Sequence, residues 1–222
     1  LGIETRSTMD IDASIKDFSL NESTASSMFK EITDIDLNDD CTFEFTRIKK
    51  ILDEEEYEGY RIFFIGRKDK IRQYLHLDLS TGDIITPSER VLEYETLLTH
   101  EPVQILAYTI ETILAEKLET VYRRSEANTR MKDFYDLYIL KTVKSNPEIS
   151  WKTLNKAFRN TLGNRETEYI LELYEEILAD ISSSDQLKTL WGRYQSNYSF
   201  ANGVHYQDCI DAISFFTNKV MS

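Results

Sequence analysis

The period of the hydrophobic pattern changes near Thr109, and this change limits the folds open to the chain. Before it, apolar and polar residues alternate in short segments, as they do along β-strands. After it, apolar residues recur three or four positions apart, as they do along one face of an α-helix. The sequence therefore predicts an α+β fold, in which a sheet with helices (domain 1–108) is followed by a helical C-terminal half (domain 109–222).

We expect most strands in the first half and most helices in the second. The predicted strands are Met9–Ile15, Cys41–Leu52, Tyr60–Arg67 and Arg72–Leu79, with two shorter ones at 91–98 and 103–108. Asn21 is expected to cap an early helix that runs to Ile32. The predicted later helices are 109–123, 131–143, 150–162, 166–181, 185–194 and 206–221.

Composition narrows the classes of function. The net charge of −13 argues against a general nucleic-acid coat and against a protein that binds membrane surfaces. No apolar run is long enough to span a membrane, and no signal peptide is apparent. Cys41 and Cys209 lack the spacing of a metal site, so we expect a reduced, cytoplasmic setting.

Two segments carry aspartates on the polar face of a predicted strand. RSTMDID, residues 6–12, contains Asp10 and Asp12, and QYLHLDLST, residues 73–81, contains Asp78. If the two strands are neighbours, three carboxylates converge and repel one another unless a cation lies among them. Mg²⁺ or Mn²⁺ would suit these oxygen ligands, so Asp10, Asp12 and Asp78 form a candidate metal site. Such pairs are also common on solvated strand faces, and that interpretation stays open.

A local excess of positive charge follows in the helical half. From Lys117 to Lys132 there are five basic and two acidic residues, which makes a candidate phosphate site in an otherwise acidic chain. Asp133 and Asp136 share one face of the next helix and could orient Lys117 or an arginine across a helix pair. On spacing alone, a salt-bridge network between helices is the interpretation that we favour.

Together, these segments resemble the AbiEii family, which comprises nucleotidyltransferase-like toxins of bacterial abortive-infection and toxin–antitoxin systems, with the mycobacterial MenT toxins as relatives. RSTMDID, ILAEKLETVYRR and RMKDFYDLYIL carry the resemblance, which extends to LWGRYQSNY and CIDAISFF near the end of the chain. It implies a polymerase-beta-like nucleotidyltransferase fold that uses Mg²⁺ and a nucleoside triphosphate, GTP or CTP above others. It also implies a possible tRNA acceptor, an antitoxin encoded nearby and a role in phage defence.

The resemblance also assigns roles to single residues. Asp10, Asp12 and Asp78 match the metal aspartates, and Lys117 matches the helix lysine that neutralises phosphate charge. Asp133 matches an acidic motif and is expected to be an orienting group or a base near the acceptor. The nucleotide-binding residues that we predict are Ser7, Lys117, Arg130, Lys132 and Asp136.

The family's first motif begins with a Gly-Gly-Thr or Gly-Ser turn, and counting back from Asp10 to that turn runs off this chain. Backbone amides of that turn would help to hold the triphosphate, so the resemblance predicts an incomplete first domain. This leaves open an inactive or non-catalytic interaction protein that retains the fold. A metal-dependent phosphatase or nuclease is the weakest alternative, because His76, His100 and His205 show no paired spacing.

Overall fold

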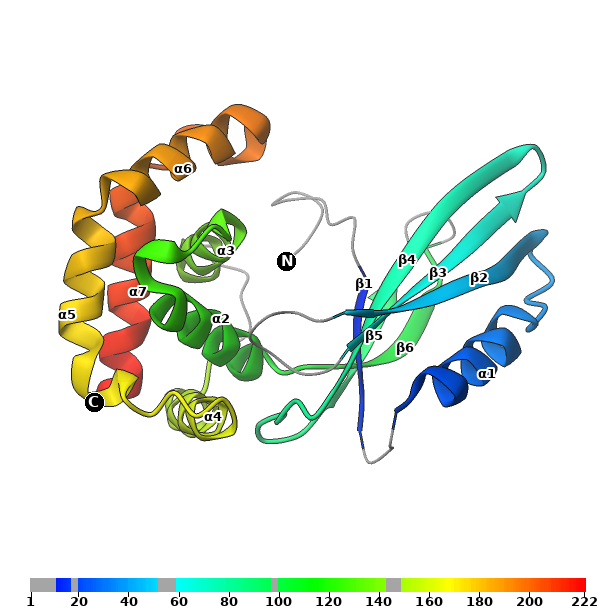
Figure 1. Cartoon of the computed structure of the whole chain (residues 1–222), viewed down its shortest axis with the longest axis horizontal. Coiled ribbons are helices and arrows are strands. Elements are labelled where there is room, and N and C mark those ends of the chain that lie inside the picture. Colours follow the sequence, from blue (N-terminus) through cyan, green and yellow to red (C-terminus); the bar gives the residue numbers. More distant parts are fainter. Residues whose placement is uncertain (1–10, 17–19, 52–58, 97–99, 143–148) are drawn as a thin grey trace. The chain divides into compact units, whose positions relative to one another are not determined.

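The computed structural model describes residues 11–16, 20–51, 59–96, 100–142 and 149–222. The chain forms two compact units, Leu1–Asp83 and Ile84–Ser222, and each is described by itself (Figure 1). Sheets and helices are both present, which confirms the mixed fold class predicted from the sequence. The predicted domain boundary at residue 108 falls inside the second unit, which also includes the hairpin that precedes the helices.

The first unit is built on a four-stranded sheet. The strand order is β1 (Ile11–Ile15), β4 (Ile71–Thr81), β3 (Gly59–Lys68) and β2 (Cys41–Ile51). Strands β2, β3 and β4 follow one another as antiparallel neighbours, whereas β1 runs parallel to β4 at the edge. All four agree with strands that the alternating pattern predicts.

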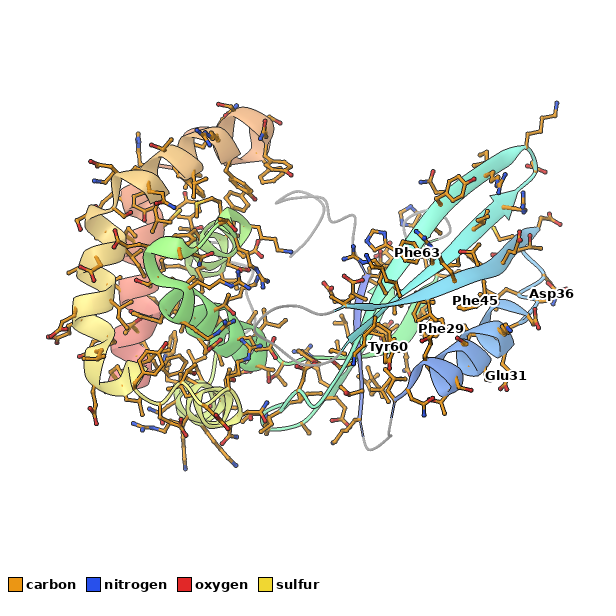
Figure 2. All side chains as sticks on the ribbon, viewed as in Figure 1. Phe29, Glu31, Asp36, Phe45, Tyr60 and Phe63 are labelled. Atoms are coloured by element: carbon orange, nitrogen blue, oxygen red, sulfur yellow. The ribbon has the colours of Figure 1, made fainter. Side chains whose placement is uncertain are left out.

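Helix α1 (Glu22–Thr33) covers one face of this sheet. It begins at Asn21, as predicted, because the Asn21 side chain accepts a hydrogen bond from the Thr24 backbone amide, and the Asn21 backbone amide donates one to the Thr24 hydroxyl oxygen. Phe29 and Tyr60 are buried between helix and sheet, and Phe45 packs against them from the same side, whereas Phe63 lies on the other side (Figure 2). The sheet therefore has one apolar face, under α1, and one polar face.

The second unit opens with the antiparallel hairpin of β5 (Arg90–Glu95) and β6 (Pro102–Ala107). The described residues that follow form the α-helices α2 (Ile110–Arg124), α3 (Met131–Thr142), α4 (Trp151–Asn164), α5 (Ile170–Ser183), α6 (Asp185–Asn197) and α7 (Tyr206–Met221). In the part of the chain that the structure describes, none of these helices is long and apolar enough to cross a membrane.

The predicted start of α5 at Glu166 is wrong by four residues. Glu166 has a φ angle of 54°, in the left-handed region that an α-helix does not use. The Thr167 amide donates back to the Leu162 carbonyl, which closes the end of α4 instead of opening the next helix. Helix α5 then begins at Ile170.

Helix α2 is largely buried in the second unit. Leu114, Leu118 and Val121 are fully shielded from solvent. The Tyr122 hydroxyl forms a hydrogen bond of 2.7 Å with Thr217 in α7. Burial raises the pKa of Tyr122 to about 12, so this phenol stays neutral at physiological pH. Polar groups on α2 must therefore find their partners inside the protein.

One such group is Glu119, whose side chain has no exposed surface. Its carboxylate lies 2.9 Å from Arg123 Nε, one turn along α2, and 2.5 Å from an Arg165 guanidinium nitrogen at the end of α4. Arg165 also donates to Thr120 over 3.2 Å. This cluster joins α2 to the C-terminus of α4, and both arginines are themselves nearly buried.

Replacing Glu119 by alanine leaves Arg123 and Arg165 buried without their carboxylate. We expect the free energy of unfolding to fall by about 3–5 kcal/mol. Urea denaturation followed by circular dichroism at the helix signal measures this loss. The control is Glu176→Ala on the exposed side of α5, which should change stability by less than about 0.5 kcal/mol. Similar losses in both variants would show that the buried cluster does not support the fold.

Candidate active site

Strands β1 and β4 are neighbours, as the distribution of aspartates predicts. They pair in parallel, and Asp12 stands opposite Asp78 in the register. Both side chains lie on the polar face, since Ala13 and Leu79 are on the side packed by α1. Two of the three predicted metal ligands are thus brought together, while Asp10 and Ser7 lie outside the described residues.

Arg61 on β3 already neutralises one of these carboxylates. Its Nε and a terminal nitrogen each lie 2.6 Å from one oxygen of Asp78, which makes a bidentate pair. The Arg61 side chain is 41% exposed and that of Asp78 is 24% exposed. Sequence reasoning missed Arg61, although its place two residues before Phe63 on an alternating strand was a signal that it shares the polar face.

A second polar group lies next to the aspartates. Ser14 stands opposite Ser80 two residues further along the strands, on the same face, and their hydroxyl oxygens are 2.6 Å apart. Asp83 accepts hydrogen bonds from both hydroxyls, over 2.7 Å in the case of Ser80. Asp83 lies two residues after the end of β4, so neither alternation nor spacing pointed to it.

The described residues meet the simplest requirement for Mg²⁺. This ion is usually held by one or two carboxylates together with substrate phosphates, and Asp12 and Asp78 are hard oxygen donors on adjacent strands. Within the described ranges, no group of three or more His, Cys, Asp or Glu side chains is placed to hold a metal. A metal at this edge would therefore depend on phosphate oxygens, on Asp10, or on both.

A second cluster of predicted site residues lies in the other unit, on α2 and α3. Lys117 Nζ lies 2.8 Å from Asp133 Oδ1 and 2.7 Å from Asp136 Oδ2. The two carboxylates are only 1% exposed, whereas the lysine side chain is 18% exposed. The predicted salt-bridge network across a helix pair is therefore present, and it fixes the position of Lys117.

Arg130 adds a second cation to the network. Its Nε lies 3.0 Å from Asp133 Oδ2, in an ion pair whose angle does not make a hydrogen bond. Asn128, which is fully buried, accepts a hydrogen bond from the Arg130 amide over 2.8 Å and so shapes the turn into α3. Lys132 is the second residue of α3, and its side chain is exposed. Of the predicted phosphate ligands, Lys117 and Arg130 share a carboxylate, and Lys132 faces solvent.

The electrostatic environment keeps Lys117 charged. Burial alone would lower its pKa, but the charges of Asp133 and Asp136 and their hydrogen bonds more than compensate, so the pKa lies above the ordinary 10.5. A general base would need the opposite shift. Lys117 is therefore a fixed cation. Its ammonium group has three N–H donors, and the two aspartates take two of them, which leaves one for an anionic ligand.

Two solved structures are similar to this chain. The crystal structure of JHP933 from Helicobacter pylori has 16% sequence identity and a TM-score of 0.42, and the match covers 98% of this chain and 78% of that one. A second Helicobacter pylori protein, whose structure is described as that of a candidate nucleotidyltransferase, has 17% identity and a TM-score of 0.33 over 80% of this chain and 68% of its own. No curated protein matches.

The sequence profile of one protein family covers nearly the whole chain. It is the profile of the AbiEii family, described as the nucleotidyl transferase AbiEii toxin of type IV toxin–antitoxin systems, and it matches residues 1–209. The matched range includes Asp12 and Asp78 at the sheet edge and the Lys117 network on α2 and α3. The chain therefore belongs to the AbiEii family of nucleotidyltransferase toxins.

Proposed function

We propose that this protein is a Mg²⁺-dependent nucleotidyltransferase that transfers a nucleotide from a nucleoside triphosphate to an acceptor such as tRNA, with GTP or CTP as the preferred substrate. The observation that carries the proposal is the direct pairing of Asp12 with Asp78 across β1 and β4. It sets two carboxylates of a nucleotidyltransferase family chain side by side on a polar sheet face. The fixed cation Lys117 supports it, since phosphoryl transfer depends on charge neutralisation.

Each residue has a distinct part in this proposal. Asp12 and Asp78, with Asp10 from outside the described residues, would hold Mg²⁺, which when bound polarises phosphoryl oxygens and lowers the pKa of a bound hydroxyl. Lys117 donates its remaining N–H to a phosphate oxygen. Asp133 is a positioning residue rather than a base, because Lys117 and Arg130 lie against its two oxygens.

The biological setting follows from the family. Its members are described as toxins of toxin–antitoxin systems, which implies an antitoxin as partner. We propose that the antitoxin is encoded nearby and that the toxin acts in the bacterial cytoplasm during phage infection, where nucleoside triphosphates and tRNA are at hand. Of the remaining assigned residues, Ser7 and Lys132 belong in this proposal to the binding of the triphosphate, whereas Asp136 acts through Lys117, which it holds in place.

One observation favours the alternative, a non-catalytic protein that retains the fold. Arg61 binds both oxygens of Asp78, so this carboxylate has a structural partner without any metal. In that case nucleotide would not bind at the sheet edge, and Asp78 would serve the stability of the first unit. Binding measurements separate the two functions.

The first test is calorimetric titration of the full-length protein with GTP, CTP, ATP and UTP, with and without Mg²⁺. We expect one nucleotide to bind in a Mg²⁺-dependent manner, and Asp12→Asn and Asp78→Asn each to weaken binding by at least about 10-fold, since each removes a negative ligand. Asp185→Asn is the control, because Asp185 is 97% exposed on α6. Equal affinity in all four proteins would refute the metal site. Absence of binding to the unaltered protein would favour the non-catalytic alternative.

The second test concerns the charge of Lys117. Lys117→Met should abolish nucleotide binding, but it also leaves two buried carboxylates with one cation fewer and should cost about 3–5 kcal/mol of stability. Adding Asp136→Asn restores a neutral network of Arg130 and Asp133. We expect the double variant to regain most of the stability while nucleotide binding stays lost. Recovery of both properties would show that Lys117 has only a structural role.

The pH dependence of binding provides a third test. A lysine whose pKa is raised contributes its full interaction below its ordinary pKa of 10.5 and loses it only as the pH rises through the higher folded value. Titrations from about pH 7 to about pH 9 should therefore show no loss of nucleotide affinity attributable to Lys117. A Lys117-dependent loss of affinity within that range would mean that the lysine is not a permanent cation.

A further inference from the structure

The face of the sheet opposite α1 has a composition unlike the rest of the chain. We call it the polar sheet face, and it includes Glu44, Arg47, Lys49, Arg61, Phe63, Ile65, Arg67, Arg72, Tyr74, His76 and Asp78. The register places them in rows across the strands, since Arg47 pairs with Phe63 and Phe63 with His76. The adjacent row contains Lys49, Arg61 and Asp78, and it ends at Asp12 on β1.

A β-bulge is needed to bring Arg47 to this face. The register of β2 against β3 shifts between Phe45 and Arg47, so Phe45 faces α1 whereas Arg47, two residues later, faces the other way. Bulges commonly re-aim a side chain in this manner. The Thr46 hydroxyl stabilises the irregular segment by donating to the Phe63 carbonyl over 2.9 Å.

Positive charge is concentrated on these strands. Residues 41–51 and 59–81 contain eight basic and three acidic side chains, although the whole chain has a net charge of −13. Residues 52–58, which join the Ile51 and Gly59 ends of two strands, add five acidic residues that lie outside the described part. At the opposite end Arg67 is paired with Glu44 over 2.9 Å, so the exposed cations that give this face its basic character are Arg47, Lys49 and Arg72.

Aromatic rings alternate with the cations. The Arg47 guanidinium lies 4.2 Å from the centroid of the Phe63 ring, and the Arg72 guanidinium lies 5.1 Å from that of Tyr74. The Phe63 and His76 rings are 6.2 Å apart. Tyr74 is 69% exposed, so one of its faces is open to solvent. Docking surfaces for proteins are poor in charge at their centre, whereas single-stranded nucleic acids bind where rings and cations alternate.

We propose that the polar sheet face binds an extended single strand of nucleic acid, whose phosphates pair with Arg47 and Arg72 and whose bases stack on Tyr74. The inference rests on the proposed transferase function and names the surface that would hold the acceptor. Tyr74, His76 and Asp78 lie on one face of β4, so Tyr74 is about 14 Å along the strand from the candidate metal site. A nucleic-acid strand bound along this face can thus place one of its ends at Asp12 and Asp78.

The experiment measures fluorescence anisotropy of labelled single-stranded RNA, single-stranded DNA of the same sequence and the RNA duplex. Arg47→Gln, Arg72→Gln and Tyr74→Thr should each weaken single-strand binding at least about 5-fold. Each arginine variant should also reduce the slope of log affinity against log salt by about 0.7. Arg159→Gln on α4 and Tyr169→Ala beside α5 are matched controls with exposed side chains and should bind as the unaltered protein does.

The outcomes separate this inference from the transferase proposal. If single strands bind through this face while no nucleoside triphosphate binds, the surface stands and the transferase function fails. If triphosphate binds but the three variants hold single strands as tightly as the controls do, the proposed binding surface is refuted and the transferase proposal is not affected. Tighter binding of the duplex would also overturn it, because stacking on Tyr74 requires unpaired bases. The RNA and DNA arms report which sugar is accepted.

Discussion

Three carboxylates of the second unit, Glu119, Asp133 and Asp136, are almost completely shielded from water, and each lies against a cation. An unpaired charge in such a place costs several kcal/mol, so each of these pairs has to form when the helices pack. Sliding α3 along α2 by one turn would separate Lys117 from both of its partners. The register of the two helices is therefore fixed by charge as well as by shape, and the position of Lys117 is fixed with it.

The ion pairs of the predicted site residues, one group in each unit, differ in how tightly they are held. Lys117 is mostly buried between carboxylates that are almost fully shielded from water, whereas Arg61 and Asp78 are both partly exposed. Water can screen and compete with an exposed pair, which lowers its net contribution. In the proposed function this difference suits the roles of the two sites. Asp78 can exchange Arg61 for another cation, while Asp133 and Asp136 keep Lys117 in place throughout.

Much of this arrangement could be predicted from the sequence because it depends on local periodicity. Alternation gave the strands and the shared face of Asp12 and Asp78, and helical spacing gave the common face of Asp133 and Asp136. Arg61 was missed because its partner Asp78 lies on another strand, and Asp83 was missed because it follows the end of β4, where the alternating pattern stops. The predicted start of α5 was wrong because the positive φ angle of Glu166 ends α4 there, whereas the acidic residues at that point suggested the first turn of a helix. Asp10 and Ser7 remain predictions.

The parallel pairing of β1 with β4 has a consequence for the order of folding. Strands β2, β3 and β4 are joined as successive antiparallel neighbours, so their contacts are local, whereas Asp12 and Asp78 are separated by most of the first unit. Contacts between residues far apart in the chain carry a larger loop-closure entropy and form more slowly. The hairpins can therefore assemble before β1 joins their edge. The earliest synthesised strand of the described sheet is then the last to join it, so the pairing of Asp12 with Asp78 waits until nearly all of the first unit has been made.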